Sequence, residues 1–119
     1  MTTTNIHLNE AMFAETERVF LENDAFKVSL FRYPSGVSAV RLENSVLSLI
    51  VLPFHGQQVW RFAHKNRDLT MKSIFDQPEN TERFGFNYGA HLIHCGLTAS
   101  GNPSPEDSHP LHGELPNCK

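Results

Sequence analysis

The chain has 119 residues, of which 39% are hydrophobic and 19% charged, and ten basic against thirteen acidic side chains give a formal net charge of −3. This length allows one domain with one modest core. The basic residues form no cluster, which argues against a nucleic-acid-binding surface, and no apolar run reaches the roughly 18 residues that a membrane-spanning helix needs.

The N-terminus has neither the basic start nor the apolar centre of a secretory signal peptide. The two cysteines, Cys95 and Cys118, are too few for the disulfide framework of a small secreted protein. We therefore expect a cytoplasmic protein with reduced thiols. Cys95 lies in an apolar run, and we interpret it as a small buried hydrophobe rather than a nucleophile.

Residues 1–16 are polar and weakly patterned, so we expect an arm with at most two helical turns over residues 9–16. From residue 17 onward, apolar and polar residues alternate with the period of two that is typical of strands. The alternation predicts strands over residues 17–21, 25–33, 37–44 and 57–64. The apolar run over 46–52 and the short segment over 69–71 are expected to be strands as well. Turns are expected at 34–36, 43–45 and 65–68, where Pro, Gly, Asn and Asp gather.

The continuous apolar run over residues 46–52 is typical of a strand buried on both faces. Strand follows strand at the spacing of sandwiches and barrels, and no segment keeps a helical period. The sequence thus predicts an all-β chain, an antiparallel β-sandwich over residues 17–119 preceded by the arm over 1–16.

Residues 73–88 are expected to form a loop whose alternating aromatics, Phe84, Phe86 and Tyr88, line a pocket or cover an edge of the core. No strand is predicted after the histidine-rich segment that follows. We therefore expect the sandwich to be incomplete in this chain, which would be the N-terminal part of a longer fold. Its exposed sheet edges are expected to pair with another chain or with a second copy.

Four of the seven histidines lie within residues 89–117. They form two pairs with the same spacing, His91 with His94 and His109 with His112. Positions three apart face opposite sides of a regular strand, and Pro110 excludes a regular helix in the second pair. A zinc site is one interpretation, although structural zinc sites normally recruit thiolates. A cupin-type metal site is another, but it needs histidines two apart together with a glutamate.

A polyol-binding site is the interpretation that we favour. A neutral imidazole has one donor and one acceptor nitrogen, so it bonds a sugar hydroxyl in either sense. Loops carrying Asn, Asp, Glu and His on a rigid β scaffold commonly form such sites. His112 is the best candidate, because Gly113 frees the backbone to approach a ligand beside the imidazole. We interpret the remaining three as ordinary loop residues: His7, His55 and His64.

Three segments, in order, resemble the aldose 1-epimerase (galactose mutarotase)-like superfamily: L-P-F-H-G-Q-Q-V-W from residue 52, Y-G-A-H-L-I-H-C-G-L from residue 88 and H-P-L-H-G-E-L-P-N from residue 109. The match is best to an uncharacterised branch with a T-C-G-L segment followed by P-L-H-G-x-x-x-N. The resemblance covers about residues 40–118. It implies a galactose mutarotase-like supersandwich that binds hexose-like sugars in an open cleft.

The resemblance also implies a reaction, the interconversion of α and β anomers. A base takes the proton of the anomeric hydroxyl, an acid protonates the ring oxygen, and the opened ring closes again on its other face. His112 matches the substrate-binding histidine of the family's His-Gly motif, and His94 stands where mutarotases carry a sugar-contacting arginine. Glu114 replaces a second glycine, and Asn117 fits the branch pattern. The family's catalytic histidine and carboxylate lie downstream of these segments, so the resemblance assigns no catalytic residue here.

Three functions are compatible with these patterns. They are a mutarotase-like epimerase, a non-catalytic sugar-binding module, and a cupin-like metalloprotein that uses the four paired histidines. We favour a carbohydrate-binding, aldose 1-epimerase-like protein whose sugar-binding residues are His112, His94, Glu114 and Asn117. We expect a small-molecule sugar as its ligand, no metal or other cofactor, and neither nucleic acid nor membrane as a partner.

Overall fold

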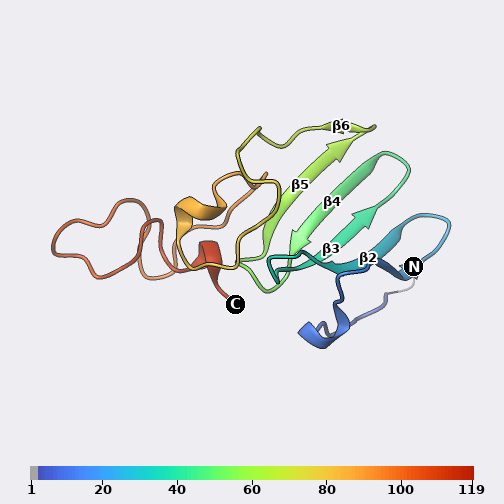
Figure 1. Ribbon diagram of the computed structural model, residues 1–119, viewed down its shortest axis with the longest axis horizontal. Coiled ribbons are helices and arrows are strands. Elements are labelled where there is room, and N and C mark those ends of the chain that lie inside the picture. Colours follow the sequence, from blue (N-terminus) through green and yellow to red (C-terminus); the bar gives the residue numbers. More distant parts are fainter. Residues whose placement is uncertain (1–2) are drawn as a thin grey trace.

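A computed structural model describes residues 3–119, and a single antiparallel sheet dominates it (Figure 1). Its strands lie in chain order, so that each pairs with the next: β1 (Arg18–Glu22), β2 (Lys27–Arg32), β3 (Ser38–Glu43), β4 (Leu47–Leu52), β5 (Gln58–His64) and β6 (Arg67–Asp68). The helical elements of the described residues are short 3-10 turns: η1 (Glu10–Met12), η2 (Phe84–Asn87) and η3 (Leu115–Asn117).

The prediction of an all-β chain is therefore confirmed. The strands of residues 3–119 belong to one open sheet, and a second sheet that would complete a sandwich stays a prediction. In the same part of the chain, no helix is long and apolar enough to cross a membrane.

Two of the predicted turns have the expected chemistry. In the β2–β3 turn, Gly36 has a positive φ of 90° and its N–H donates to the carbonyl of Tyr33 at 2.8 Å. In the β3–β4 turn, the Asn44 side chain accepts hydrogen bonds from the N–H groups of Val46 and Leu47 at 2.9 and 2.7 Å. Glycine and asparagine thus set these two hairpins for the reasons that the sequence indicates.

The β5–β6 hairpin differs from its prediction. The turn consists of Lys65 and Asn66 alone, with φ values of 47° and 63°, and β6 occupies residues 67–68 rather than 69–71. Two consecutive positive φ angles define a type I′ turn, which matches the twist of a hairpin. The expected four-residue turn over 65–68 is therefore wrong, because the two-residue turn lets strand pairing resume at once.

The two faces of the sheet carry separate apolar clusters. The first cluster consists of Phe31, Val37, Ala39, Ile50, Leu52, Trp60 and Ala90, and the second of Phe13, Leu30 and Val40. In β4, Ile50 and Leu52 are buried in the first cluster, whereas Leu47, Leu49 and Val51 on the other face are only partly buried. The prediction that this strand is buried on both faces is therefore wrong, because the second face is incompletely covered.

Residues 8–14 of the predicted arm pack on the sheet and supply much of the second cluster. The Phe13 side chain is 3% exposed, and its ring meets that of Phe54 edge-on with centroids 5.7 Å apart. The backbone N–H of Arg32 donates to the carbonyl of Ala14 at 2.7 Å, and its guanidinium donates to the carbonyl of Glu10 at 2.7 Å. In Figure 1 this segment, drawn in blue, runs along one side of the sheet.

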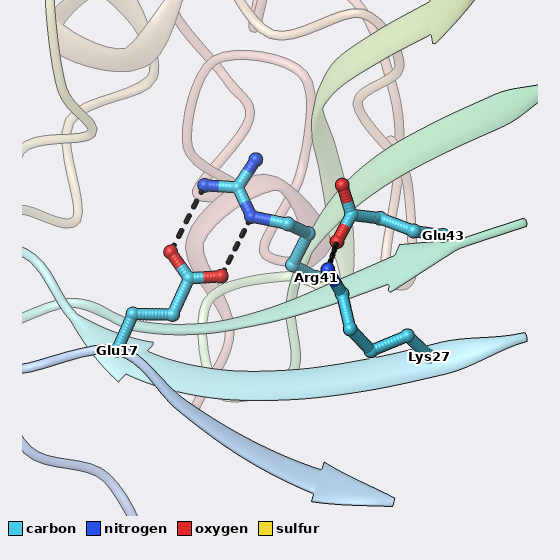
Figure 2. A network of polar contacts seen from close by, with 4 residues as sticks. All are labelled: Glu17, Lys27, Arg41 and Glu43. Atoms are coloured by element: carbon cyan, nitrogen blue, oxygen red, sulfur yellow. Dashed lines mark hydrogen bonds and ion pairs between the residues drawn. The ribbon is translucent and has the colours of Figure 1, made fainter. Parts of the chain in front are cut away.

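Charged side chains lie over the opposite face near the same strands (Figure 2). The Arg41 guanidinium binds both carboxylate oxygens of Glu17, at 2.8 and 3.3 Å, and lies 5.4 Å from the centroid of the Phe31 ring. The Lys27 ammonium lies 3.0 Å from the Glu43 carboxylate on the neighbouring strand. These pairs are partly exposed, so each contributes little free energy, but together they cover this end of the first face.

Arg61 connects the sheet to the irregular chain that follows it. Its guanidinium lies 4.3 Å from the centroid of the Trp60 ring and donates to the carbonyls of Gly89 and Phe75, at 3.2 and 3.0 Å. Beyond these contacts, Val59 pairs with Leu92 in an isolated antiparallel bridge. The first core face is therefore covered by residues 75–93, although no regular strand runs there.

We predict that Phe13→Ala lowers the free energy of unfolding by about 3 kcal/mol, because truncating a buried aromatic ring removes its packing and leaves a cavity. Urea denaturation followed by Trp60 fluorescence measures this loss. Ile74→Ala is the control, because Ile74 is 91% exposed and its truncation is expected to change the free energy of unfolding by less than about 0.5 kcal/mol. Equal effects of the two substitutions would show that residues 8–14 are not part of the folded core.

Candidate functional site

Four buried polar side chains hold η2 and η3 against the β4–β5 turn. We call them the amide–imidazole network: His55, Gln58, Asn87 and Asn117, which are 3%, 0%, 1% and 7% exposed. The interpretation of His55 as an ordinary loop residue is therefore wrong. Sequence offers little signal for this burial, because the partners come from three segments that are far apart in the chain.

The network joins side chains to the backbone of η3. The Gln58 amide nitrogen donates to the carbonyl of Pro116 at 2.5 Å and lies 3.4 Å from the Asn117 side-chain oxygen. The Asn87 amide nitrogen lies 3.0 Å from the same Asn117 oxygen and 2.8 Å from Nε2 of His55. Leaving buried polar groups unpaired is costly. Although Gln58 Oε1 has no partner among residues 3–119, the other contacts of the network fix where η3 lies.

Gly56 allows η3 to approach the turn at backbone distance. Its N–H donates to the carbonyl of Cys118 at 2.6 Å, and its φ is 62°. A Cβ at this position would collide with the carbonyl oxygens of Leu115 and Pro116. The His-Gly pair at residues 55–56 thus brings an imidazole and a bare backbone segment together under η3.

Gly113 makes a second close approach of backbone to backbone. Its φ is 85°, and a Cβ there would collide with the carbonyl oxygens of Gly96 and Ala99. Gly96 donates to the carbonyl of His112 at 2.8 Å, and its own carbonyl accepts from Glu114 at 3.1 Å. The interpretation that Gly113 frees the backbone to approach a ligand is therefore wrong, because the segment of residues 96–99 fills that space.

Two hollows adjoin at η3. The first, which we call the glutamate hollow, has a volume of about 450 Å³ and is lined by Glu82, Pro110, Gly113, Glu114, Asn117, Cys118 and Lys119. The second, the cysteine hollow, has a volume of about 390 Å³ and is lined by Pro53, Gly56, Gln57, His94, Cys95, Leu115, Cys118 and Lys119. Cys118 and Lys119 line both, so the two hollows share one wall.

The predicted sugar-binding residues do not all line the same hollow. Glu114 and Asn117 line the glutamate hollow, and His94 lines the cysteine hollow. His112 lies against the Phe84 ring with centroids 4.3 Å apart, and has a positive φ of 62°. The structure thus brings Glu114 and Asn117 together, with His112 next to them in the chain and His94 across the shared wall.

Glu114 is a predicted sugar-binding residue that lines the glutamate hollow. Its carboxylate accepts a hydrogen bond from the backbone N–H of Thr98 at 3.1 Å, and this bond lowers the pKa of the Glu114 carboxyl. A carboxylate stabilised in this way is a good hydrogen-bond acceptor and a weak base. Glu82, on the opposite segment of the same hollow, was not among the predicted residues.

The paired histidines do not converge. The His91 ring meets that of Phe62 with centroids 5.0 Å apart, and His109 Nδ1 lies 2.8 Å from the carbonyl of Pro110. Within residues 3–119, no three His, Cys, Asp or Glu side chains are placed to hold a metal ion. The predicted burial of Cys95 is also wrong, because its thiol is exposed at the cysteine hollow.

Comparison of the chain with protein-family models, with curated proteins and with solved structures finds no significant match. The resemblance to the aldose 1-epimerase-like superfamily stays a prediction that rests on three sequence segments.

We predict that Gly113→Ala lowers the free energy of unfolding by about 4 kcal/mol, because a Cβ adds a backbone collision to the cost of a positive φ. Gly101→Ala is the matched control: Gly101 also has a φ of 85°, but a Cβ there would meet nothing within 4 Å. It should cost only about 1–2 kcal/mol, the cost of the left-handed conformation alone. Chemical denaturation of both variants measures the difference, and equal losses would contradict the close packing of residues 96 and 113.

Proposed function

We propose that this chain binds a hexose-like sugar, as an aldose 1-epimerase-like protein. The observation that supports this proposal best is the glutamate hollow, at which the segment of residues 82–88 meets the predicted sugar-binding segment of residues 109–117. Two independent features therefore coincide at one place, a motif resemblance and a cavity of about 450 Å³, a size typical of small-molecule sites.

The lining of the glutamate hollow suits a polyol. The carboxylates of Glu82 and Glu114 accept hydrogen bonds from hydroxyl groups, and the ammonium of Lys119 donates them. Phe84, two residues after Glu82 of the hollow, has its ring centroid 4.3 Å from that of His112 and 5.7 Å from that of Tyr88. Aromatic rings offer apolar surface to the carbon-bound face of a sugar, while the carboxylates and ammonium match its hydroxyl edge.

Anomer interconversion by this site is the reaction that we propose in line with the resemblance. It needs an acid and a base on either side of the sugar ring. The lowered pKa of Glu114 favours hydrogen bonding over proton abstraction. This observation supports a second candidate, a sugar-binding module without catalysis.

Two further parts of the proposal rest on other features. A cytoplasmic location rests on the small number of cysteines. Pairing with a second copy or another chain rests on β1, an edge strand on which Val19 is 55% exposed.

Proton NMR with freshly dissolved α-glucose and α-galactose tests the proposal. We expect saturable shifts of protein signals, and Glu114→Gln should weaken sugar binding roughly tenfold, because a charged hydrogen-bond acceptor is lost. Glu106→Gln is the control, because Glu106 is exposed and does not line the glutamate hollow. His112→Ala removes the ring that lies against Phe84 and is expected to weaken binding in the same direction.

The rate of anomer interconversion in the same samples separates the two candidates. Acceleration that Glu114→Gln and His112→Ala abolish would support an epimerase. Saturable shifts without acceleration would support a binding module. Neither shifts nor acceleration with either sugar, or equal binding by Glu114→Gln and the unaltered chain, would contradict a sugar site in this hollow.

A further inference from the structure

We propose that His55 is a positioning residue: its neutral imidazole holds the walls of the glutamate hollow together, and its protonation releases them. The protonation of His55 would control the binding of a sugar only if the function proposed above holds. The release of η3 does not depend on it.

The orientation of the Asn87 amide fixes which form of His55 the structure contains. The Asn87 oxygen accepts from the N–H of Glu79 at 2.8 Å, and its nitrogen donates to the carbonyl of Glu79 at 3.0 Å. The N–H and carbonyl of Glu79 thus distinguish the oxygen from the nitrogen of the Asn87 amide. The nitrogen end lies 2.8 Å from His55 Nε2, so Nε2 must accept, and the imidazole is neutral with its proton on Nδ1.

A protonated His55 does not fit this arrangement. Both ring nitrogens of an imidazolium are donors, so Nε2–H would face an N–H group of Asn87. The acceptor left to the protonated ring is the Asn117 oxygen, which already faces the amide nitrogens of Gln58 and Asn87. Asn87 cannot turn its oxygen toward the ring without breaking both hydrogen bonds to Glu79. With His55 3% exposed and Asn87 1% exposed, water cannot relieve the conflict unless the site opens.

The surroundings of His55 also favour its neutral form. Burial lowers the pKa of His55, a hydrogen bond with Asn117 partly opposes this effect, and the Lys119 ammonium lowers the pKa further. The other groups that face the ring, the amides of Asn87 and Asn117, are neutral, and Glu79 contributes its backbone. Because the pKa is lower in the closed state than in an open one, the closed state keeps its full stability above about pH 6.5. It loses stability as the pH falls below that value.

Loss of the contacts at His55 would displace residues on two sides of the glutamate hollow. Asn87 ends η2, which follows Glu82, while Asn117 lines the hollow itself. The neighbouring bond from the Gly56 N–H to the carbonyl of Cys118 lies directly beside His55 and ties down the chain between Asn117 and Lys119. The N–H of Gly56 is therefore a built-in reporter of whether η3 is docked.

Hydrogen exchange of the Gly56 N–H, measured by NMR and divided by its intrinsic rate at each pH, tests the proposal in the full chain. Between pH 7.5 and 5.0 we expect its protection to fall roughly tenfold, the effect of losing one buried hydrogen bond. In His55→Gln the fall should disappear, because the glutamine oxygen can accept from Asn87 and does not titrate. His64→Gln, a change at an exposed histidine of β5, should behave like the unaltered chain.

An unchanged protection of Gly56 in the unaltered chain, or the same fall in His55→Gln, would overturn the proposal. Should His55→Gln not fold, the unaltered chain decides alone. The NMR titration of the His55 ring must then have the same midpoint as the loss of Gly56 protection, and different midpoints would refute the link. Glucose titrations at both pH values keep the two proposals apart: no binding at either pH contradicts the sugar site, while Gly56 still reports on His55.

Discussion

The hydrogen bonds between the β4–β5 turn and η3 are the contacts on which the irregular half of this protein depends. Beyond residue 68 the described chain has two 3-10 turns and isolated bridges, so no extended ladder of strands holds it in place. Gln58, Asn87 and Asn117 supply buried side-chain bonds instead, and Gly56 supplies a backbone bond. In a buried, poorly solvated setting such bonds are directional and costly to leave unmade. They therefore select one arrangement of the loops, and with it the shape of both hollows.

The sheet supports this arrangement unequally on its two faces. The first face is closed by Trp60 and by residues 75–93, which Arg61 fastens through backbone carbonyls. The second face is closed at one end by Phe13 and is open at the other, where Leu42 is 38% exposed. The charged pairs of Figure 2 lie on the first face only. Gln58, which bonds to η3, pairs with Leu52 of this first face.

The strands β1, β2, β3 and β5 could be predicted from local alternation, and β4 from its continuous apolar run. The β5–β6 turn was misplaced because two consecutive positive φ angles at Lys65 and Asn66 leave no hydrophobic signal. The packing of residues 8–14 on the sheet was missed because its apolar side chains, Leu8, Met12 and Phe13, are scattered in a polar segment without a regular period. At the site, the sequence pointed to Glu114 and Asn117, but not to Glu82 or His55, because these residues meet only through tertiary contacts. Gly113 was singled out for the wrong reason, since its bare face meets backbone rather than ligand.

The order of the strands has a consequence for how the chain folds. Every strand pairs with its neighbour in sequence, so the sheet assembles through short loops that cost little entropy to close. The bonds from Gln58 to Pro116 and from Asn87 to His55 instead join positions 58 and 32 residues apart. Contacts of such separation form slowly and after local ones. We therefore expect the hollows to take shape after the sheet when the chain refolds.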